Sequence, residues 1–343
     1  MYSSVVPAVL SKYGLNYKTI KNVQKGYRNE SYPIILNDEK TINLIFYKRE
    51  PNIIDRMTRA DKISGYLSNK GFPVRARYSP KTLQLKSRQM VTYAALYNYL
   101  PGATIPWEGY TKKHIKLLGL AMSDMHAVLE SMSVSWPEDH TIVAELLEIL
   151  TRMETYFNDA SVTRALEEKL HVSIQNDYLT KLRTLILLMK DSPDQRPLHM
   201  DMVRGNVLFS ENAQGGYWKI DEISLAGVID FEKASYGHPI FDIARTLAFL
   251  FVDCPVKSEL KIRRYFLSSG YTKRGKSAFN YKAMFSGISH GQILDGLIGF
   301  FLLHDFYKFL RHTPYESLES NEHYMRTRNI LIRDTMVRYS KAQ

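Results

Sequence analysis

An island of strand-like sequence interrupts the helical second half of this chain, and it constrains the fold more than any other segment. The island covers residues 198–232 and reads LHMDMVRGNVLF, then GYWKI, then LAGVIDFE. A turn over 211–216 between two apolar runs predicts that these runs pair as a hairpin. Asp201 precedes that turn and Asp230 follows it, 29 positions further along the chain. Because polar groups gather where strands end, we expect a site with two carboxylates here.

The rest of the chain divides into a strand-rich first part and a helix-rich second part. Strand-like runs at 42–47 and 90–100 flank one stretch with helical spacing. Helical spacing dominates residues 110–190 and returns from residue 239 onward. With 343 residues the chain exceeds the usual size of one hydrophobic core, so the sequence predicts two lobes.

Composition and charge favour a cytoplasmic protein with anionic ligands. The one cysteine, Cys254, excludes an intrachain disulfide framework and suits a reducing compartment. No apolar stretch reaches the roughly 18 residues that span a membrane, and the N-terminus lacks a signal-peptide pattern. The net charge of +11 favours anionic partners such as nucleotides. The positive residues are dispersed, so we expect neither a nucleic-acid nor a membrane partner; the sequence does not indicate an oligomeric state.

The polar residues of the island suit the chemistry of magnesium and phosphate. Asn206 follows Asp201 by five residues, and Asp230 ends a strand-like run. Magnesium takes hard oxygen ligands, commonly one or two protein groups with phosphate oxygens and water. If Asn206 and Asp230 hold the metal, Asp201 remains to accept the proton of a substrate hydroxyl, as in kinase-type phosphoryl transfer. A His-x-Asp segment alone is more often a loop cap, but the combination favours catalysis.

These motifs resemble those of the aminoglycoside phosphotransferase and choline kinase family. His199, Asp201 and Asn206 match a catalytic loop that usually reads His-Gly-Asp-x-x-x-x-Asn. Residues 229–244 match an Ile-Asp-(Phe/Trp) metal motif followed by Gly-x-Pro-x-x-Asp-(Leu/Ile)-Ala. The resemblance implies a small-molecule kinase that uses Mg²⁺ and either ATP or GTP. It implies that Asp201 is the catalytic base, that Asn206 and Asp230 hold the metal, and that His199 and Asp242 brace the loops.

The resemblance also implies the architecture, an α+β bilobal protein-kinase-like fold. A small N-terminal lobe, 1–96, would carry an antiparallel sheet with one helix and bind the nucleotide. A hinge at 97–102 would lead to a larger, mainly helical C-terminal lobe, 103–343, which holds the catalytic and acceptor sites. The hinge residues expected to bind the purine are Tyr97, Asn98 and Tyr99.

The phosphate-binding part of the N-terminal lobe departs from the family pattern. The turn at 25–32 has a single glycine, so Ser31 is expected to help bind phosphate, and an ordinary hairpin is the alternative. Lys48 is the candidate for the family's strand lysine, although the apolar pattern aligns Ile45 with that position. Alternate residues of a strand face opposite sides, so only one of these two can face the site. Asp61 is the expected carboxylate partner of the lysine, with surface charges as the alternative.

The catalytic loop departs as well. Met200 stands where the family usually has glycine. Two residues after Asp201 the chain has the apolar Val203, which offers no imidazole or ammonium group to act on the γ-phosphate. Arg204 could reach the transferred phosphate instead; the alternative is an arginine that faces solvent.

The acceptor is not specified by the sequence. Relatives phosphorylate hydroxyls of antibiotics and of metabolites such as choline, and we expect a metabolic alcohol or amino-alcohol before an antibiotic. A cationic acceptor would need acidic pocket walls, and solvated helix faces are the alternative reading of the acidic candidates. These candidates are Asp295, Asp305, Glu316, Glu319 and Glu322. The weak phosphate turn leaves a non-catalytic nucleotide-binding regulatory protein of the same fold as the other possible function.

Overall fold

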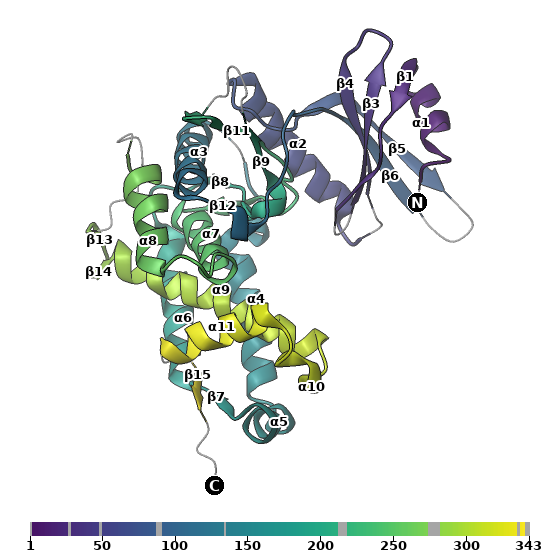
Figure 1. Ribbon diagram of the computed structural model, residues 1–343. Helices are drawn as coiled ribbons and strands as arrows, with labels where there is room; N and C mark the ends of the chain where they lie inside the picture. Colours follow the sequence, from purple (N-terminus) through teal and green to yellow (C-terminus); the bar gives the residue numbers. More distant parts are fainter. Residues whose placement is uncertain are drawn as a thin grey trace. The chain divides into compact units, whose positions relative to one another are not determined.

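The computed structural model describes residues 2–26, 29–47, 50–86, 91–133, 135–211, 218–273, 282–334 and 337–339. The chain forms two compact units (Figure 1). The sheet unit combines Met1–Ile105 with Arg204–Ala234, and the helical unit combines Pro106–Val203 with Ser235–Gln343. Residues 204–232 of the strand island, which the sequence assigns to the C-terminal lobe, thus group with the N-terminal residues in this division, whereas residues 198–203 belong to the helical unit.

An antiparallel sheet with strand order β1-β3-β4-β6-β5 is the framework of the sheet unit, and β2 pairs with the edge of β3. Two helices accompany it, α1 (Val6–Lys12) and α2 (Ile53–Asn69). The strands are β1 (Tyr17–Ile20), β2 (Gln24–Lys25), β3 (Asn29–Leu36), β4 (Thr41–Tyr47), β5 (Arg77–Lys86) and β6 (Val91–Asn98).

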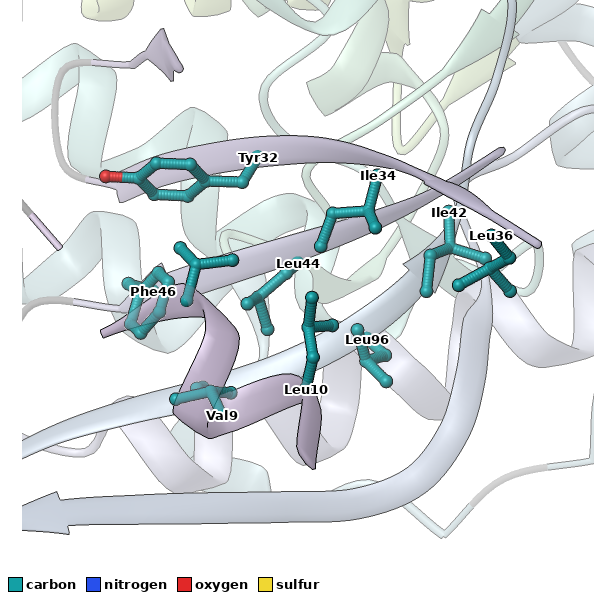
Figure 2. Packing of buried hydrophobic residues seen from close by; sticks show 11 residues of the cluster. Val9, Leu10, Tyr32, Ile34, Leu36, Ile42, Leu44, Phe46 and Leu96 are labelled. Atoms are coloured by element: carbon teal, nitrogen blue, oxygen red, sulfur yellow. The ribbon is translucent and has the colours of Figure 1, made fainter. Parts of the chain in front are cut away.

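The central strand β4 is buried on both faces because a different helix packs on each. Figure 2 shows one face, where Val9 and Leu10 of α1 lie among side chains of β3, β4 and β6. The β4 residues on this face are Ile42, Leu44 and Phe46. The alternate residues Ile45 and Tyr47 pack instead with Ile53 and Met57 of α2. This explains why the run INLIFY has apolar residues on both faces of the strand, with Asn43 as its one polar residue.

The strand island forms a second small sheet, and its pairing corrects the predicted hairpin. The strands β9 (Val207–Glu211), β10 (Trp218–Ile220) and β11 (Ile223–Val228) have the order β10-β11-β9. The hairpin therefore joins β10 to β11 through a tight turn, and β9 pairs with the other edge of β11. Asp221 adopts a left-handed conformation in this turn (φ 53°), which a short polar residue tolerates well. Sequence alone did not reveal this turn because its two residues, Asp221 and Glu222, are neither Gly nor Asn.

The end of β11 also contacts the segment that follows α2. The Val228 amide donates to the Pro73 carbonyl at 3.0 Å, and the Arg75 amide donates to the Val228 carbonyl at 3.2 Å. A Cβ atom on Gly227 would lie 2.9 Å from the Pro73 oxygen, so only glycine permits this approach. These contacts fix the end of β11, where Asp230 follows.

The helical unit consists of packed helices with short strand pairs between them. Its longest described helices are α3 and α9, and no described helix is both long and apolar enough to cross a membrane. The helices are α3 (Lys112–Glu130), α4 (Ile142–Phe157), α5 (Ala160–Leu170), α6 (Asn176–Leu188), α7 (Ile240–Asp253), α8 (Glu259–Arg263), the π-helical η5 (Arg264–Tyr271), α9 (His290–His312), α10 (Tyr315–Leu318) and α11 (Glu322–Arg333). The strand pairs are β8 (Arg196–Leu198) with β12 (Ser235–Gly237), β7 (Val172–Ile174) with β15 (Val337–Tyr339), and β13 (Met284–Phe285) with β14 (Ile288–Ser289). The short 3₁₀ turns are η1 (Trp107–Gly109), η2 (Glu138–His140), η3 (Met189–Asp191) and, in the sheet unit, η4 (Arg204–Asn206).

Close packing of α3 against η5 depends on Gly119. A Cβ atom there would lie 2.2 Å from the Phe266 carbonyl oxygen and 2.9 Å from the Tyr271 amide. We expect Gly119→Ala to lower the free energy of unfolding by about 1–3 kcal/mol, because backbone would have to move. Gly65→Ala is the matched control: this position lies inside α2 with no atom within 4 Å of the added Cβ. It should raise stability by roughly 0.5–1 kcal/mol. Urea unfolding measures both changes, and equal stability of the two variants would contradict this packing.

Candidate active site

The loop that carries Asp201 is held in place by one buried carboxylate. The loop follows β8, and Asp242 lies in the first turn of α7. Asp242 accepts hydrogen bonds from the backbone amides of His199 (2.9 Å) and Met200 (2.5 Å). Its side chain is 1% exposed. Asp242 thus has the bracing role that the family resemblance implies.

Asp242 also bonds to a histidine that sequence reasoning did not assign to the site. His126 Nε2 of α3 lies 2.9 Å from Asp242 Oδ2, and His126 Nδ1 lies 2.7 Å from the Tyr271 hydroxyl. Burial alone would raise the pKa of Asp242, but the hydrogen bond from His126 and the amide of His199 hold it below its ordinary value. Burial lowers the pKa of His126 in turn. The loop therefore rests on an ionised aspartate inside the helical unit.

Met200 occupies the position where the family pattern has glycine, and its backbone shows why glycine is usual. Its φ is +58°, in the left-handed region that side chains with a Cβ adopt at a cost of roughly 1–2 kcal/mol. The Met200 amide donates to Asp242 and its side chain is 2% exposed, so a hydrogen bond and packing offset that strain.

Asp201 lies next to a guanidinium group. Arg245 Nη2 of α7 is 3.4 Å from Asp201 Oδ1, and Asp201 as a whole is 8% exposed. The Asp201 amide donates a hydrogen bond to His199 Nδ1 at 3.1 Å. The His199 side chain thus holds the backbone of the loop, in line with the bracing role predicted from the sequence. The position and burial of Asp201 suit a carboxylate that accepts a proton from a bound hydroxyl.

The two predicted metal ligands belong to the sheet unit and are connected through the backbone. Asn206 ends η4 and is 8% exposed. Its carbonyl accepts a hydrogen bond from the Ile229 amide at 2.9 Å, which places the Asn206 loop beside the residue that precedes Asp230. Asp230 has a φ of +68° directly after β11. Among the described residues no group of three or more His, Cys, Asp and Glu forms a metal site. An amide oxygen and a carboxylate fit the hard ligand set of Mg²⁺.

Glu232 is a further carboxylate of this loop that sequence reasoning missed. The Glu232 amide lies 3.4 Å from Asp230 Oδ1, and its side chain accepts a hydrogen bond from Asn29 Nδ2 at 2.8 Å. Burial raises the pKa of Glu232 to about 7, the Asp230 charge adds to the rise, and Arg75 opposes it. The signal was present in the sequence as the fourth letter of IDFE.

Asp61 is already paired within the sheet unit. Its carboxylate is 2.8 Å from Arg77 Nε of β5 and accepts a hydrogen bond from the Tyr97 hydroxyl at 3.2 Å. Burial raises the pKa of Asp61 although Arg77 opposes the rise. Lys48, its predicted partner, lies outside the described residues. The β4 residues that pack against α2 include Ile45 and Tyr47.

The other predicted nucleotide contacts lie at the sheet. The Ser31 hydroxyl donates to Asn43 Oδ1 at 3.0 Å. Tyr97 is buried, and its hydroxyl accepts from the Tyr47 hydroxyl at 2.8 Å. The Asn98 amide donates to the Ala76 carbonyl at 2.9 Å, so this donor is not available to a purine. Tyr99 lies beyond the end of β6 and is the hinge candidate outside the strand ladder.

The acidic residues considered as walls for a cationic acceptor all form ion pairs. The pairs are Asp295 with Arg263 (2.8 Å), Asp305 with Lys308 (2.7 Å), Glu316 with Lys169 (3.0 Å), Glu319 with Arg328 (3.9 Å) and Glu322 with Arg326 (2.7 Å). Arg204 is exposed, in agreement with the alternative that it faces solvent.

Comparison with known proteins identifies the class of the molecule. The chain belongs to the phosphotransferase enzyme family, whose profile matches residues 19–272. The predicted family, the bilobal α+β protein-kinase-like fold and the enzyme class, a phosphotransferase, are thereby confirmed. A search of curated proteins returns no significant match.

Solved structures with this fold include several small-molecule kinases. Amicoumacin kinase hAmiN in complex with AMP-PNP, Ca²⁺ and Ami has a TM-score of 0.65 at 17% identity, and the match covers 98% of this chain and 96% of that chain. The microcompartment-associated aminopropanol kinase has a TM-score of 0.58 at 14% identity, with 97% and 99% covered. Choline kinase from Cryptosporidium parvum Iowa II has a TM-score of 0.51 at 13% identity, with 97% of each chain covered. At these identities the likeness establishes the fold.

Proposed function

We propose that this protein is a Mg²⁺-dependent small-molecule kinase that transfers the γ-phosphate of ATP or GTP to a hydroxyl group of a small metabolite or antibiotic. The observation that carries the proposal is the loop held by Asp242, which carries Asp201 and is followed in the sequence, five residues after Asp201, by Asn206. A fixed carboxylate followed by a metal-binding amide is what phosphoryl transfer needs from the protein, since positioning supplies most of the catalysis. The complex of hAmiN with AMP-PNP and Ca²⁺ supports a nucleotide and a divalent cation.

Each residue has a distinct proposed task. Asp201 orients the acceptor hydroxyl and accepts its proton, while Asn206 and Asp230 hold the metal. Bound magnesium neutralises charge on the nucleotide phosphates. Arg77 and Tyr97 keep Asp61 in a fixed position on α2.

The nucleotide is assigned to the sheet unit. Ser31 and Lys48 are proposed to meet its phosphates, with Asp61 supporting them. The backbone near Tyr99 is proposed to bind the purine, and the single cysteine agrees with a cytoplasmic location.

The test is thermal stabilisation of the purified protein by ATP and by GTP, each with and without Mg²⁺, followed by nucleotide turnover across an acceptor panel. We expect magnesium-dependent stabilisation and turnover that an acceptor stimulates. Stabilisation with no turnover on any acceptor would favour the non-catalytic nucleotide-binding alternative. No stabilisation by either nucleotide would contradict both functions.

Replacement of the proposed metal ligand tests the sheet unit separately. We expect Asp230→Ala to weaken the affinity for Mg-ATP by about tenfold or more, because one of two protein ligands is lost. Calorimetric titration with and without Mg²⁺ measures this. Glu222→Ala, an exposed carboxylate in the β10–β11 turn, is the matched control and should bind like the parent protein. An unchanged magnesium dependence in Asp230→Ala would remove Asp230 from the metal site.

A further inference from the structure

Arg245 places a positive charge beside the proposed catalytic base. It lies on α7, three residues after the Asp242 that holds the catalytic loop. Its Nη2 atom is 3.4 Å from Asp201 Oδ1, and the side chains of Arg245 and Asp201 are 15% and 10% exposed. All three residues belong to the helical unit. The charge is therefore fixed where an acceptor hydroxyl must approach Asp201.

The guanidinium group is held by aromatic rings and keeps unused hydrogen-bond donors. Its carbon lies 5.7 Å from the ring centroids of both Phe249 and Phe301, a geometry that favours a cation over each ring. The contact with Asp201 is a single long one, whereas a guanidinium has five donors. Arg245 Nε is buried and has no hydrogen-bond partner in the part of the chain that the structure describes. Arg245 thus has more capacity for an anion than Asp201 uses.

Asp201 is the acidic group that contacts Arg245, and the carboxylates considered as walls for a cationic acceptor have ion-pair partners of their own. The five carboxylates that could have formed acidic walls are each paired with a lysine or arginine of the helical unit. An amine brought to Asp201 would meet the Arg245 guanidinium at short range, where like charges repel. An anionic group would instead gain a partner that binds carboxylate and phosphate in two parallel hydrogen bonds.

We propose that Arg245 selects the acceptor, and that the acceptor is a hydroxyl compound carrying an anionic group, carboxylate or phosphate, close to the reacting hydroxyl. This inference rests on the proposed kinase function. In the reaction the bond between the γ-phosphorus and the β,γ-bridging oxygen breaks, and a bond forms between that phosphorus and the acceptor oxygen. The hydroxyl proton passes to Asp201 and the nucleoside diphosphate leaves. When the anionic group of the acceptor binds Arg245, the guanidinium releases Asp201 Oδ1. That oxygen can then accept the hydroxyl proton.

Matched acceptors of opposite charge test the proposal. One series is 4-hydroxybutyrate, 1,4-butanediol and 4-amino-1-butanol; a second pair, glycerol 3-phosphate and glycerol, distinguishes phosphate from carboxylate. Binding is measured by saturation-transfer NMR with Mg²⁺ and AMP-PNP, and kcat/KM with ATP. We expect an anionic member to exceed its neutral analogue by about tenfold or more, and the amine to rank last.

Variants show whether Arg245 causes that ranking. Arg245→Gln should abolish the preference for the anion, and Arg245→Lys, which keeps the charge, should retain part of it. Arg333→Gln, which removes an exposed arginine paired with Glu259, is the matched control and should keep the ranking. Thermal unfolding checks that each variant is folded. If Arg245→Gln does not fold, Arg245→Lys alone is compared with the parent protein.

Several outcomes would overturn the inference. These are a preference for the amine or the neutral compound, the absence of binding by every anionic member, or an unchanged ranking in Arg245→Gln. Binding of Mg²⁺ with AMP-PNP is measured first in the same samples. Its absence would contradict the kinase function itself, whereas nucleotide binding without an anion preference would contradict only the role of Arg245.

Discussion

Asp201→Asn is expected to reduce kcat by about 10²–10⁴-fold, the range that a general base contributes. An amide has nearly the shape of the carboxylate but cannot accept the hydroxyl proton. The affinity for Mg-nucleotide should stay largely intact, because Asp201 acts on the acceptor while Asn206 and Asp230 act on the metal. Steady-state kinetics and nucleotide titration separate the two effects.

Asp191→Asn provides the control for this experiment. Asp191 is an exposed aspartate in η3, ten residues before Asp201 on the same unit, and its replacement should leave kcat and nucleotide affinity unchanged. A near-normal kcat in Asp201→Asn would show that another group takes the proton. A loss of nucleotide affinity equal to the loss of kcat would assign Asp201 to the metal instead.

Asp242→Ala is expected to have the largest effect on stability, about 3–5 kcal/mol. It removes a buried ionised carboxylate and leaves the His199 and Met200 amides and His126 without their acceptor. Urea unfolding measures the change. Asp177→Ala is the control, because its ion pair with Lys181 is exposed and such pairs contribute about 0.3–0.5 kcal/mol. A loss in Asp242→Ala no larger than in the control would mean that the loop is held by other contacts.

The same carboxylate predicts a pH dependence with a definite sign. The pKa of Asp242 is lower in the folded protein than its ordinary value of 3.8. Its contribution to stability is therefore fully present above that ordinary value and is lost as the pH falls through the folded pKa. The stability difference between the parent protein and Asp242→Asn should shrink below about pH 4. A difference that stays constant with pH would contradict ionisation of Asp242.

The sequence predicted those parts of the molecule that depend on local pattern. The strands around INLIFY, the long helices and the loops with Asp201 and Asp230 all follow from periodicity and motif. The β10–β11 hairpin did not, because its turn, Asp221-Glu222, contains neither Gly nor Asn, and the pairing of β9 with the far edge of β11 is not encoded locally.

Partners far apart along the chain were beyond sequence reasoning. His126 contacts Asp242 across 116 positions, and Arg77 of β5 pairs with Asp61 of α2. Arg245 is an ordinary arginine in sequence, and only the turn of α7 that follows Asp242 brings it to Asp201. Such pairings arise from packing between elements, for which a single sequence carries no direct signal.

The division of the chain has a consequence for how this protein can be dissected and recombined. The chain passes from one unit to the other after Ile105, Val203 and Ala234. A gene fragment that ends at residue 105 would encode the large sheet without β9 to β11, and would expose the backbone of Pro73 and Arg75 that β11 covers. An exchange of sheet units between two relatives by a single crossover would have the same defect. A graft of this unit must therefore include residues 204–234 as a second insert. The proposed metal ligands Asn206 and Asp230 would then come from the donor protein together with the sheet, whereas Asp201 would come from the recipient.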